Sequence, residues 1–266
     1  MHTGCIERVI VAVTNLDIAC ERWKRAGFAV AGERASIDGA GYARFAAGAV
    51  EIDLCALDSS AAKGPLADAI ARKAGDGGGV IGWTWGGAAD GALPAKGAIM
   101  LASLTGTPIM AAAAEPSFHG AFTARVEVES TKDARIAALR RHCGNNANTV
   151  EFLEHIVVMV KVLDDAIAAY EAAGVPCRRI RDAGPGIRQA FFKLEDTVLE
   201  VVGPSPRAAG VWGLAFMCGD IARAVATARQ NGFEATEPKA AVQGGLIARI
   251  VEPLDGVAVA YMERPH

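Results

Sequence analysis

An internal repeat constrains this 266-residue chain more than any other feature of its sequence. When residues 152–204 are shifted back by 147 positions, Val160 falls on Val13 and Glu200 falls on Asp53 without a gap. Each copy has the pattern of a strand, a helix that stops at a glycine, and then three short strands. A unit of this kind cannot bury its apolar face alone and needs a partner. The chain is therefore expected to be built from paired modules.

Two further copies complete the set. A forward shift of 58 positions places Gly174 on Gly232 and identifies a module over residues 211–263. Residues 80–130 form the weakest copy, because only the opening strand matches. Pro94 and several glycines interrupt the helix signal that should follow this strand.

The order of the copies predicts two domains. A short helix signal within residues 59–79 connects the first two modules, and a polar run near residue 148 marks the domain boundary. The predicted N-terminal domain, 1–148, contains modules 5–58 and 80–130, and the predicted C-terminal domain, 149–266, contains modules 152–204 and 211–263.

Composition narrows the classes of partner. Hydrophobic residues make up 52% of the chain and the net charge is −3, which favours a large core and argues against a nucleic-acid-binding face. No apolar run is long enough for a membrane helix. The first residues lack a basic segment followed by a long apolar one, so we expect no signal peptide. The scattered cysteines, without a CxxC pair, are typical of a reducing cytoplasm. We expect a small-molecule partner, and a homodimer is left open.

Four such modules in two pairs resemble the vicinal-oxygen-chelate superfamily, which includes glyoxalase I, the bleomycin-resistance proteins and the extradiol dioxygenases. The run LEHIVVMVKVLDDAIAAYEAAG, followed by TVLEVVGP, and its weaker copies carry the resemblance. The resemblance implies an α+β fold of four βαβββ modules paired into two glyoxalase-like domains with curved mixed β-sheets. The arrangement is most similar to that of two-domain glyoxalase-like proteins.

The resemblance also indicates a site in the C-terminal domain. His155 on a first strand and Glu200 on a last strand occupy the positions where the superfamily places metal ligands, which implies a divalent metal such as Zn, Ni, Mn or Fe. The partner module offers only Gly213 and Ala258 at the matching positions. Three roles therefore stay open for the pair: metal ligands, a metal-free functional pair, or a structural pair.

Two arginine patterns add to the site hypothesis. Arg179, Arg181 and Arg188 fall on the middle strands of the same module. They are candidates for binding an anionic substrate group, and a solvated strand edge is the alternative. In the first module, Arg8 and Asp53 replace His155 and Glu200. We expect Arg8 and Asp53 to contact each other and the N-terminal domain to serve as a scaffold.

The leading functional hypothesis is a glyoxalase-like lyase or isomerase that acts on a small oxygenated, anionic metabolite. In this hypothesis Glu200 acts as a base and His155 polarises an oxygen, or both hold a metal. The alternative is a metal-free binding protein of the bleomycin-resistance type, which sequesters its ligand. A dioxygenase is disfavoured because its two-histidine, one-carboxylate ligand set is missing.

Overall fold

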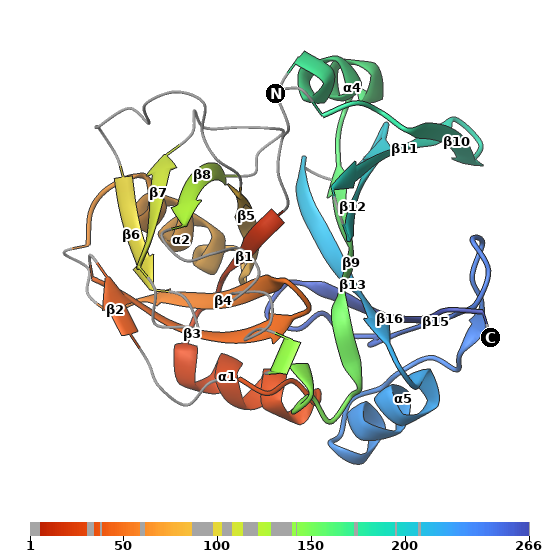
Figure 1. Ribbon diagram of the computed structural model, residues 1–266, viewed down its shortest axis with the longest axis horizontal. Coiled ribbons are helices and arrows are strands. Elements are labelled where there is room, and N and C mark those ends of the chain that lie inside the picture. Colours follow the sequence, from red (N-terminus) through yellow and green to blue (C-terminus); the bar gives the residue numbers. More distant parts are fainter. Residues whose placement is uncertain are drawn as a thin grey trace.

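The computed structural model of the chain (Figure 1) contains two curved sheets with helices around them. It describes residues 6–30, 35–37, 39–58, 62–86, 98–102, 108–113, 122–128, 140–141, 143–172, 175–194, 196–206 and 209–265. In this part of the chain, no helix is long and apolar enough to span a bilayer.

The first sheet and its helices come from the N-terminal half. They are β1 (Ile6–Ala12), α1 (Leu16–Arg25), β2 (Ala35–Ile37), β3 (Ala40–Ala47), β4 (Val50–Leu57), α2 (Pro65–Gly75), β5 (Gly79–Gly86), β6 (Ala98–Ala102), β7 (Pro108–Ala113) and β8 (Phe122–Val128). The helix expected between β5 and β6 falls outside the described residues.

The second sheet and its helices come from the C-terminal half. They are β9 (Val150–Met159), α4 (Leu163–Ala172), β10 (Arg179–Gly184), β11 (Ile187–Leu194), β12 (Thr197–Gly203), β13 (Gly210–Cys218), α5 (Ile221–Gln230), β14 (Lys239–Ala240), β15 (Leu246–Arg249) and β16 (Ala258–Glu263).

The two sheets have the same topology. The strand orders are β2-β3-β4-β1-β5-β8-β7-β6 and β10-β11-β12-β9-β13-β16-β15-β14. The strand register is also repeated. Arg44 pairs with Asp53 in the first sheet, and the residues 147 positions later, Phe191 and Glu200, pair in the second. The predicted α+β class with curved mixed sheets is confirmed.

Helix ends follow the signals in the sequence. Asn15 caps α1 by accepting a hydrogen bond from the N–H of Ile18, and Asp220 caps α5 in the same way. Gly27 and Gly232 follow these two helices with φ of +93° and +83°, a region that favours glycine. Both glycines are the helix stops that the repeat predicts.

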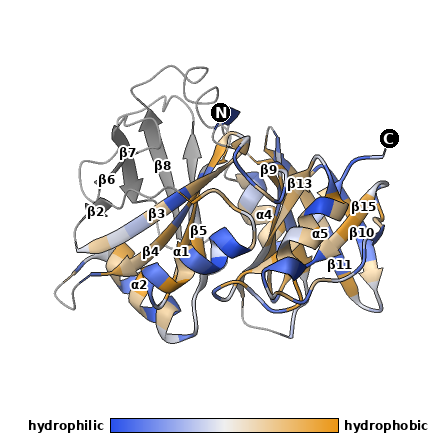
Figure 2. Cartoon of the chain, turned by 90° about the horizontal axis from the view of Figure 1, so that it is seen from below, coloured by the Kyte–Doolittle hydropathy of each residue, from blue (hydrophilic) through white to orange (hydrophobic). Residues whose placement is uncertain are grey.

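A single core joins the backs of the two sheets. Phe28 from the first half lies 5.0 Å from Phe216 of the second half, measured between ring centroids, and Trp23 and Phe45 lie in the same cluster. In Figure 2, β9 and β13 are mostly hydrophobic, whereas α1 carries hydrophilic residues along one side. The domain division near residue 148 stays a prediction, and the halves share buried packing across it.

The other face of each sheet, which we call the inner face, differs between the halves. In the first half α2 packs on the inner face, where Ile70 contacts a cluster that includes Ile10 and Tyr42 (Figure 1). In the second half only residues 204–209 connect the two modules, which is too short for such a helix. Inner-face residues of the first sheet are therefore buried, whereas Val157 and Met159 of the second are partly exposed.

Candidate functional site

The strand register places both predicted site residues on the inner face of the second sheet. Glu200 in β12 lies beside Val157 in the parallel strand β9, and His155 precedes Val157 by two residues. Residues two apart in a strand point to the same side of a sheet. His155 and Glu200 therefore share one face, at neighbouring positions in adjacent strands.

The two residues differ in access to solvent. β12 alternates between buried and partly exposed residues, and Glu200 belongs to the partly exposed set. His155 is only 4% exposed, and its ring makes an edge contact with Phe191, with centroids 6.4 Å apart. Glu200 is thus the group that a ligand meets first, and His155 lies deeper.

A chain of hydrogen bonds links the edge of the sheet to Glu200. Nε of Arg181 donates to Oε1 of Gln189 at 2.6 Å, and Nε2 of Gln189 donates to Oε1 of Glu200 at 2.6 Å. Only this orientation of the amide satisfies both neighbours, because Arg is a donor and a carboxylate is an acceptor. Arg181 also lies over the ring of Phe191, with Cζ 5.2 Å from the centroid. Gln189 was not among the residues predicted from the sequence. The available signal was its position two residues before Phe191, which places both side chains on the same face of β11.

A β-bulge adds a second group that the sequence analysis missed. Ala215 pairs with His155 and Phe216 pairs with Leu153, so Glu154 has no partner in β13. A bulge re-aims the side chain of the extra residue, and Oε2 of Glu154 contacts Nδ1 of His155. The only signal in the sequence is that a glutamate also stands at the repeat position before Arg8.

The first module has the same bulge. Ile6 pairs with Trp85 and Arg8 pairs with Thr84, which leaves position 7 of β1 without a partner. The irregularity therefore belongs to the module rather than to one copy. Because the bulge recurs at the same position in both modules, the bulge at Glu154 is a regular part of the fold and not a local irregularity of the second sheet.

Burial sets the protonation of the site. It lowers the pKa of His155 to about 4, and the positive charges of Lys193 and Arg181 add to this effect. It also raises the pKa of Glu200, while Arg181 acts in the opposite direction. His155 is therefore neutral at pH 7. Nδ1 faces the carboxylate of Glu154, so a neutral imidazole that keeps its proton on Nδ1 has Nε2 as its proton acceptor.

The three predicted arginines separate in the structure. Arg181 joins Glu200 through Gln189, and Arg179 is exposed on the same face of β10. Arg188 lies on the opposite face, where its Nη2 donates to both carboxylate oxygens of Asp164 in α4 at 2.8 and 2.9 Å. The structure therefore does not bring Arg188 together with the other two.

In the first half the equivalent positions form a closed ion cluster. Nε of Arg8 lies 3.1 Å from Oδ2 of Asp53, so the predicted contact is confirmed. Arg44 lies 3.0 Å from the other oxygen of Asp53, and Glu51 accepts from Arg8. All four side chains are buried. Two positive and two negative charges thus balance each other on the inner face that α2 covers.

Comparison with known proteins supports the fold. No protein-family model and no curated protein matches the chain. A triple mutant of 4-hydroxymandelate synthase from Streptomyces coelicolor matches 98% of this chain and 93% of its own, with a TM-score of 0.63 and 15% identity. A xylose isomerase-like TIM barrel/4-hydroxyphenylpyruvate dioxygenase fusion protein matches all of this chain and 49% of its own, with a TM-score of 0.61 and 14% identity. The chain has the vicinal-oxygen-chelate fold.

These similarities carry no activity with them. Methylmalonyl-CoA epimerase from Mycobacterium tuberculosis is 21% identical, but the match covers 44% of this chain and 91% of that protein, with a TM-score of only 0.39. At 14 and 15% identity the two longer matches show the vicinal-oxygen-chelate fold alone. The chemistry must therefore be argued from the residues of this chain.

The described residues do not fit the divalent metal that the vicinal-oxygen-chelate fold suggests. They contain no group of three or more His, Cys, Asp or Glu side chains placed to hold an ion. Gly213 and Ala258 continue the row of Val157 across β13 and β16, and neither has a donor side chain. His155 and Glu200 already contact Glu154 and Gln189. A catalytic metal usually needs about three protein ligands.

Proposed function

We propose that the inner face of the second sheet binds a small anionic, oxygenated metabolite and acts on it by metal-independent acid–base chemistry of the lyase or isomerase type. The observation that carries the proposal is the hydrogen-bonded chain from Arg181 through Gln189 to Glu200, beside the Glu154–His155 contact. It lies on the inner face of the second sheet, which no helix of the described chain covers. The equivalent residues of the first half are buried under one.

The contacts of Arg181 support the proposal that the substrate is anionic. Its Nε is used by Gln189, and no carboxylate among the described residues forms an ion pair with its guanidinium. Its two Nη groups can therefore donate to a carboxylate of the ligand. The stacking of Arg181 on Phe191 fixes the plane of the guanidinium before a ligand arrives.

His155 and Glu200 supply the proton transfers. Because Nδ1 of His155 faces Glu154, Nε2 is the atom that takes a proton from the substrate. Glu200 holds a proton more readily than an ordinary carboxyl group, since burial raises its pKa, and it gives this proton to the substrate oxygen. The proposal therefore exchanges the roles expected from the sequence, where Glu200 was the base.

Binding without turnover is the second candidate. The row from Val157 through Gly213 to Ala258 presents only small or apolar side chains to the ligand, which favours a sequestering face over a reactive one. Under this alternative the chain Arg181–Gln189–Glu200 only recognises the ligand, and no proton moves.

One experiment separates the two candidates. Small 2-oxo and 2-hydroxy acids are titrated against the full chain by calorimetry, and bound acids are incubated in D₂O while NMR follows the loss of the proton next to the carbonyl or hydroxyl carbon. Exchange that Glu200→Gln and His155→Gln abolish, with binding retained, supports the enzyme. Binding without exchange supports sequestration.

Arg181→Gln should weaken binding by about tenfold, because it removes a charged hydrogen-bond donor. Arg178→Gln is the matched control, since Arg178 is exposed and lies directly before β10. Equal binding by the Arg181 variant and wild type would overturn the proposal. So would a stoichiometric, tightly held metal in protein purified without chelator.

A further inference from the structure

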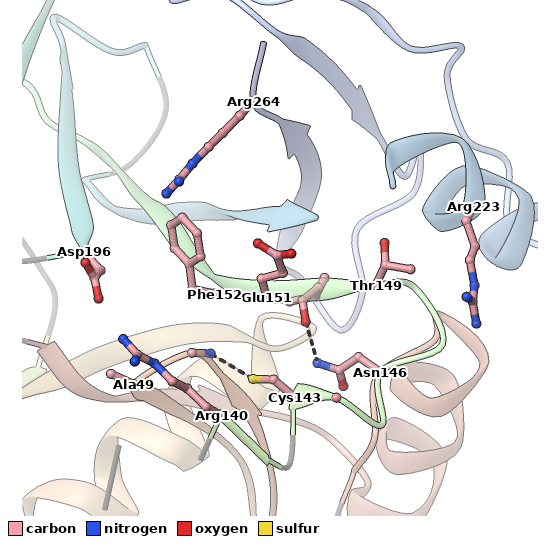
Figure 3. Close-up of a pocket in the computed structure, with 13 residues that line it drawn as sticks. Ala49, Arg140, Cys143, Asn146, Thr149, Glu151, Phe152, Asp196, Arg223 and Arg264 are labelled. Carbon is pink, nitrogen blue, oxygen red and sulfur yellow. Dashed lines mark hydrogen bonds between the residues drawn. The ribbon is translucent and has the colours of Figure 1, made fainter. Parts of the chain in front are cut away.

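A cavity of about 570 Å³ lies where the two halves meet, away from His155 and Glu200 (Figure 3). Its lining comes from segments far apart in the sequence: the β3–β4 turn, residue 140, residues within 143–149, the start of β9, and single residues of the second half.

The wall between the halves is firmly packed. The N–H of Gly48 donates to Sγ of Cys143 at 2.9 Å, and the buried side chain of Asn146 bonds to the backbone of Ala29 and Val150. A methyl group on Gly48 would come within 2.4 Å of Cβ of Phe152, so the turn lies directly against β9. The cavity is thus held in shape before a ligand enters.

Three arginines from different elements line the cavity. Arg140 lies in the chain shortly before Cys143, Arg223 lies on α5, and Arg264 follows β16. Among the described residues no carboxylate forms an ion pair with any of them. The described part of the lining also contains Glu151 and Asp196, so the described lining residues have an excess of one positive charge.

The arginines mark two ends of the cavity. In Figure 3, Arg140 and Arg264 lie toward one end, where Asp196 also lies, and Arg223 lies at the other end, with Glu151 and Thr149 between the two ends. Cζ of Arg264 lies 5.3 Å from the centroid of the Phe152 ring, and this stacking orients its donors. Guanidinium groups at both ends match anions, and the carboxylate of Glu151 between them matches ligand hydroxyl groups. The hydroxyl of Thr149 is already bonded to the backbone of Asp220, donating to its carbonyl oxygen and accepting from its N–H.

We propose that this junction cavity binds a small polyhydroxylated metabolite with an anionic group at each end, of the sugar bisphosphate class. One anionic group lies between Arg140 and Arg264, and the other lies at Arg223. Glu151 accepts hydrogen bonds from the hydroxyl groups between them. A ligand held there contacts both halves and stabilises their packing.

Calorimetry on the full chain at constant ionic strength tests the proposal with fructose bisphosphate as the probe. The dicarboxylate glutarate, which lacks hydroxyl groups, should bind more weakly. Arg140→Gln with Arg264→Gln should weaken fructose bisphosphate binding by at least about tenfold. Arg72→Gln, which removes an exposed arginine on α2, should leave binding unchanged. Thermal unfolding checks that each variant is folded.

The proposal is overturned if wild type does not bind fructose bisphosphate, or if the double variant binds it as wild type does. It is also overturned if Arg72→Gln weakens binding equally, because this result indicates unspecific charge attraction. Glu200→Gln separates the two sites. Loss of 2-oxo acid exchange with fructose bisphosphate binding intact leaves the junction site independent of the proposed function.

Discussion

Asp53 and Glu200 occupy the same position in two copies of one module, yet Asp53 is sealed between Arg8 and Arg44 while Glu200 is partly exposed and bonded to a neutral amide. The difference arises because α2 covers the first inner face, whereas no helix among the described residues covers the second. One copy of the site has become a structural ion cluster, and the other keeps groups that a ligand can reach.

Asp53→Asn should be strongly destabilising. The variant leaves two buried guanidinium groups with one carboxylate, and breaking a buried ion pair in this way costs about 3–5 kcal/mol of unfolding free energy. Urea unfolding followed by circular dichroism measures the loss. Asp182→Asn, at an exposed position of β10, should change stability by less than about 0.5 kcal/mol. Similar values for the two variants would show that the cluster is not stabilising.

The stability of the protein should depend on the titration of His155. Its pKa is about 4 in the folded chain and about 6.5 when unfolded, so the unfolded state binds more protons between these values. This contribution is fully present above pH 6.5 and is lost as the pH falls toward 4, by about 3 kcal/mol in total. His155→Gln should flatten this part of the pH profile of urea unfolding. An unchanged profile would contradict the lowered pKa.

Gly213 should not tolerate a side chain. A Cβ there would lie 2.5 Å from the carbonyl oxygen of Ala258, and the backbone of β16 cannot move without breaking its pairing with β13. We expect Gly213→Ala to lower the unfolding free energy by about 1–3 kcal/mol. Gly75→Ala has open space at the end of α2 and should be neutral or stabilising by up to about 1 kcal/mol. Equal effects in thermal unfolding would refute the steric argument.

Ile70→Ala tests the packing of α2 on the first inner face. Ile70 is fully buried there, and the truncation should cost about 2–5 kcal/mol. Ile18→Ala is the control, since Ile18 is 60% exposed on α1 and its loss should cost little. Denaturant unfolding of both variants gives the comparison. A small cost at Ile70 would mean that α2 does not stabilise the first half.

The repeat predicted the fold because register follows the alternation of apolar residues, which survives in both copies. The pairings of Asp53 and Glu200 follow directly from the 147-residue offset. The same logic missed Glu154, because a bulge depends on the pairing of two strands and leaves no mark in the alternation of one. The sequence also suggested that Arg188 and Arg181 share a face. In the hairpin of β10 and β11, Arg188 pairs with Asp182, the neighbour of Arg181, and therefore points to the opposite face.

The docking of α2 could not be read from the sequence either. Its apolar stripe and its terminal signals are local, and they predict the helix. Which surface the stripe covers depends on the curvature of a sheet whose strands are far apart in the chain. From the sequence this segment was therefore predicted only as a connector. In the structure α2 covers the inner face of the first half, which leaves the inner face of the second half as the accessible one.

The shared core behind the two sheets also bears on how such a chain can diverge. Because the backs of both halves pack into one cluster, the sealed first half contributes to the stability of the whole chain. Mutations on the open face of the second half, most of which cost some stability, can then accumulate before the chain reaches its folding threshold. A closed half beside an open half thus provides mutational tolerance, and substitutions that alter ligand specificity on the open face can be accommodated while the architecture persists.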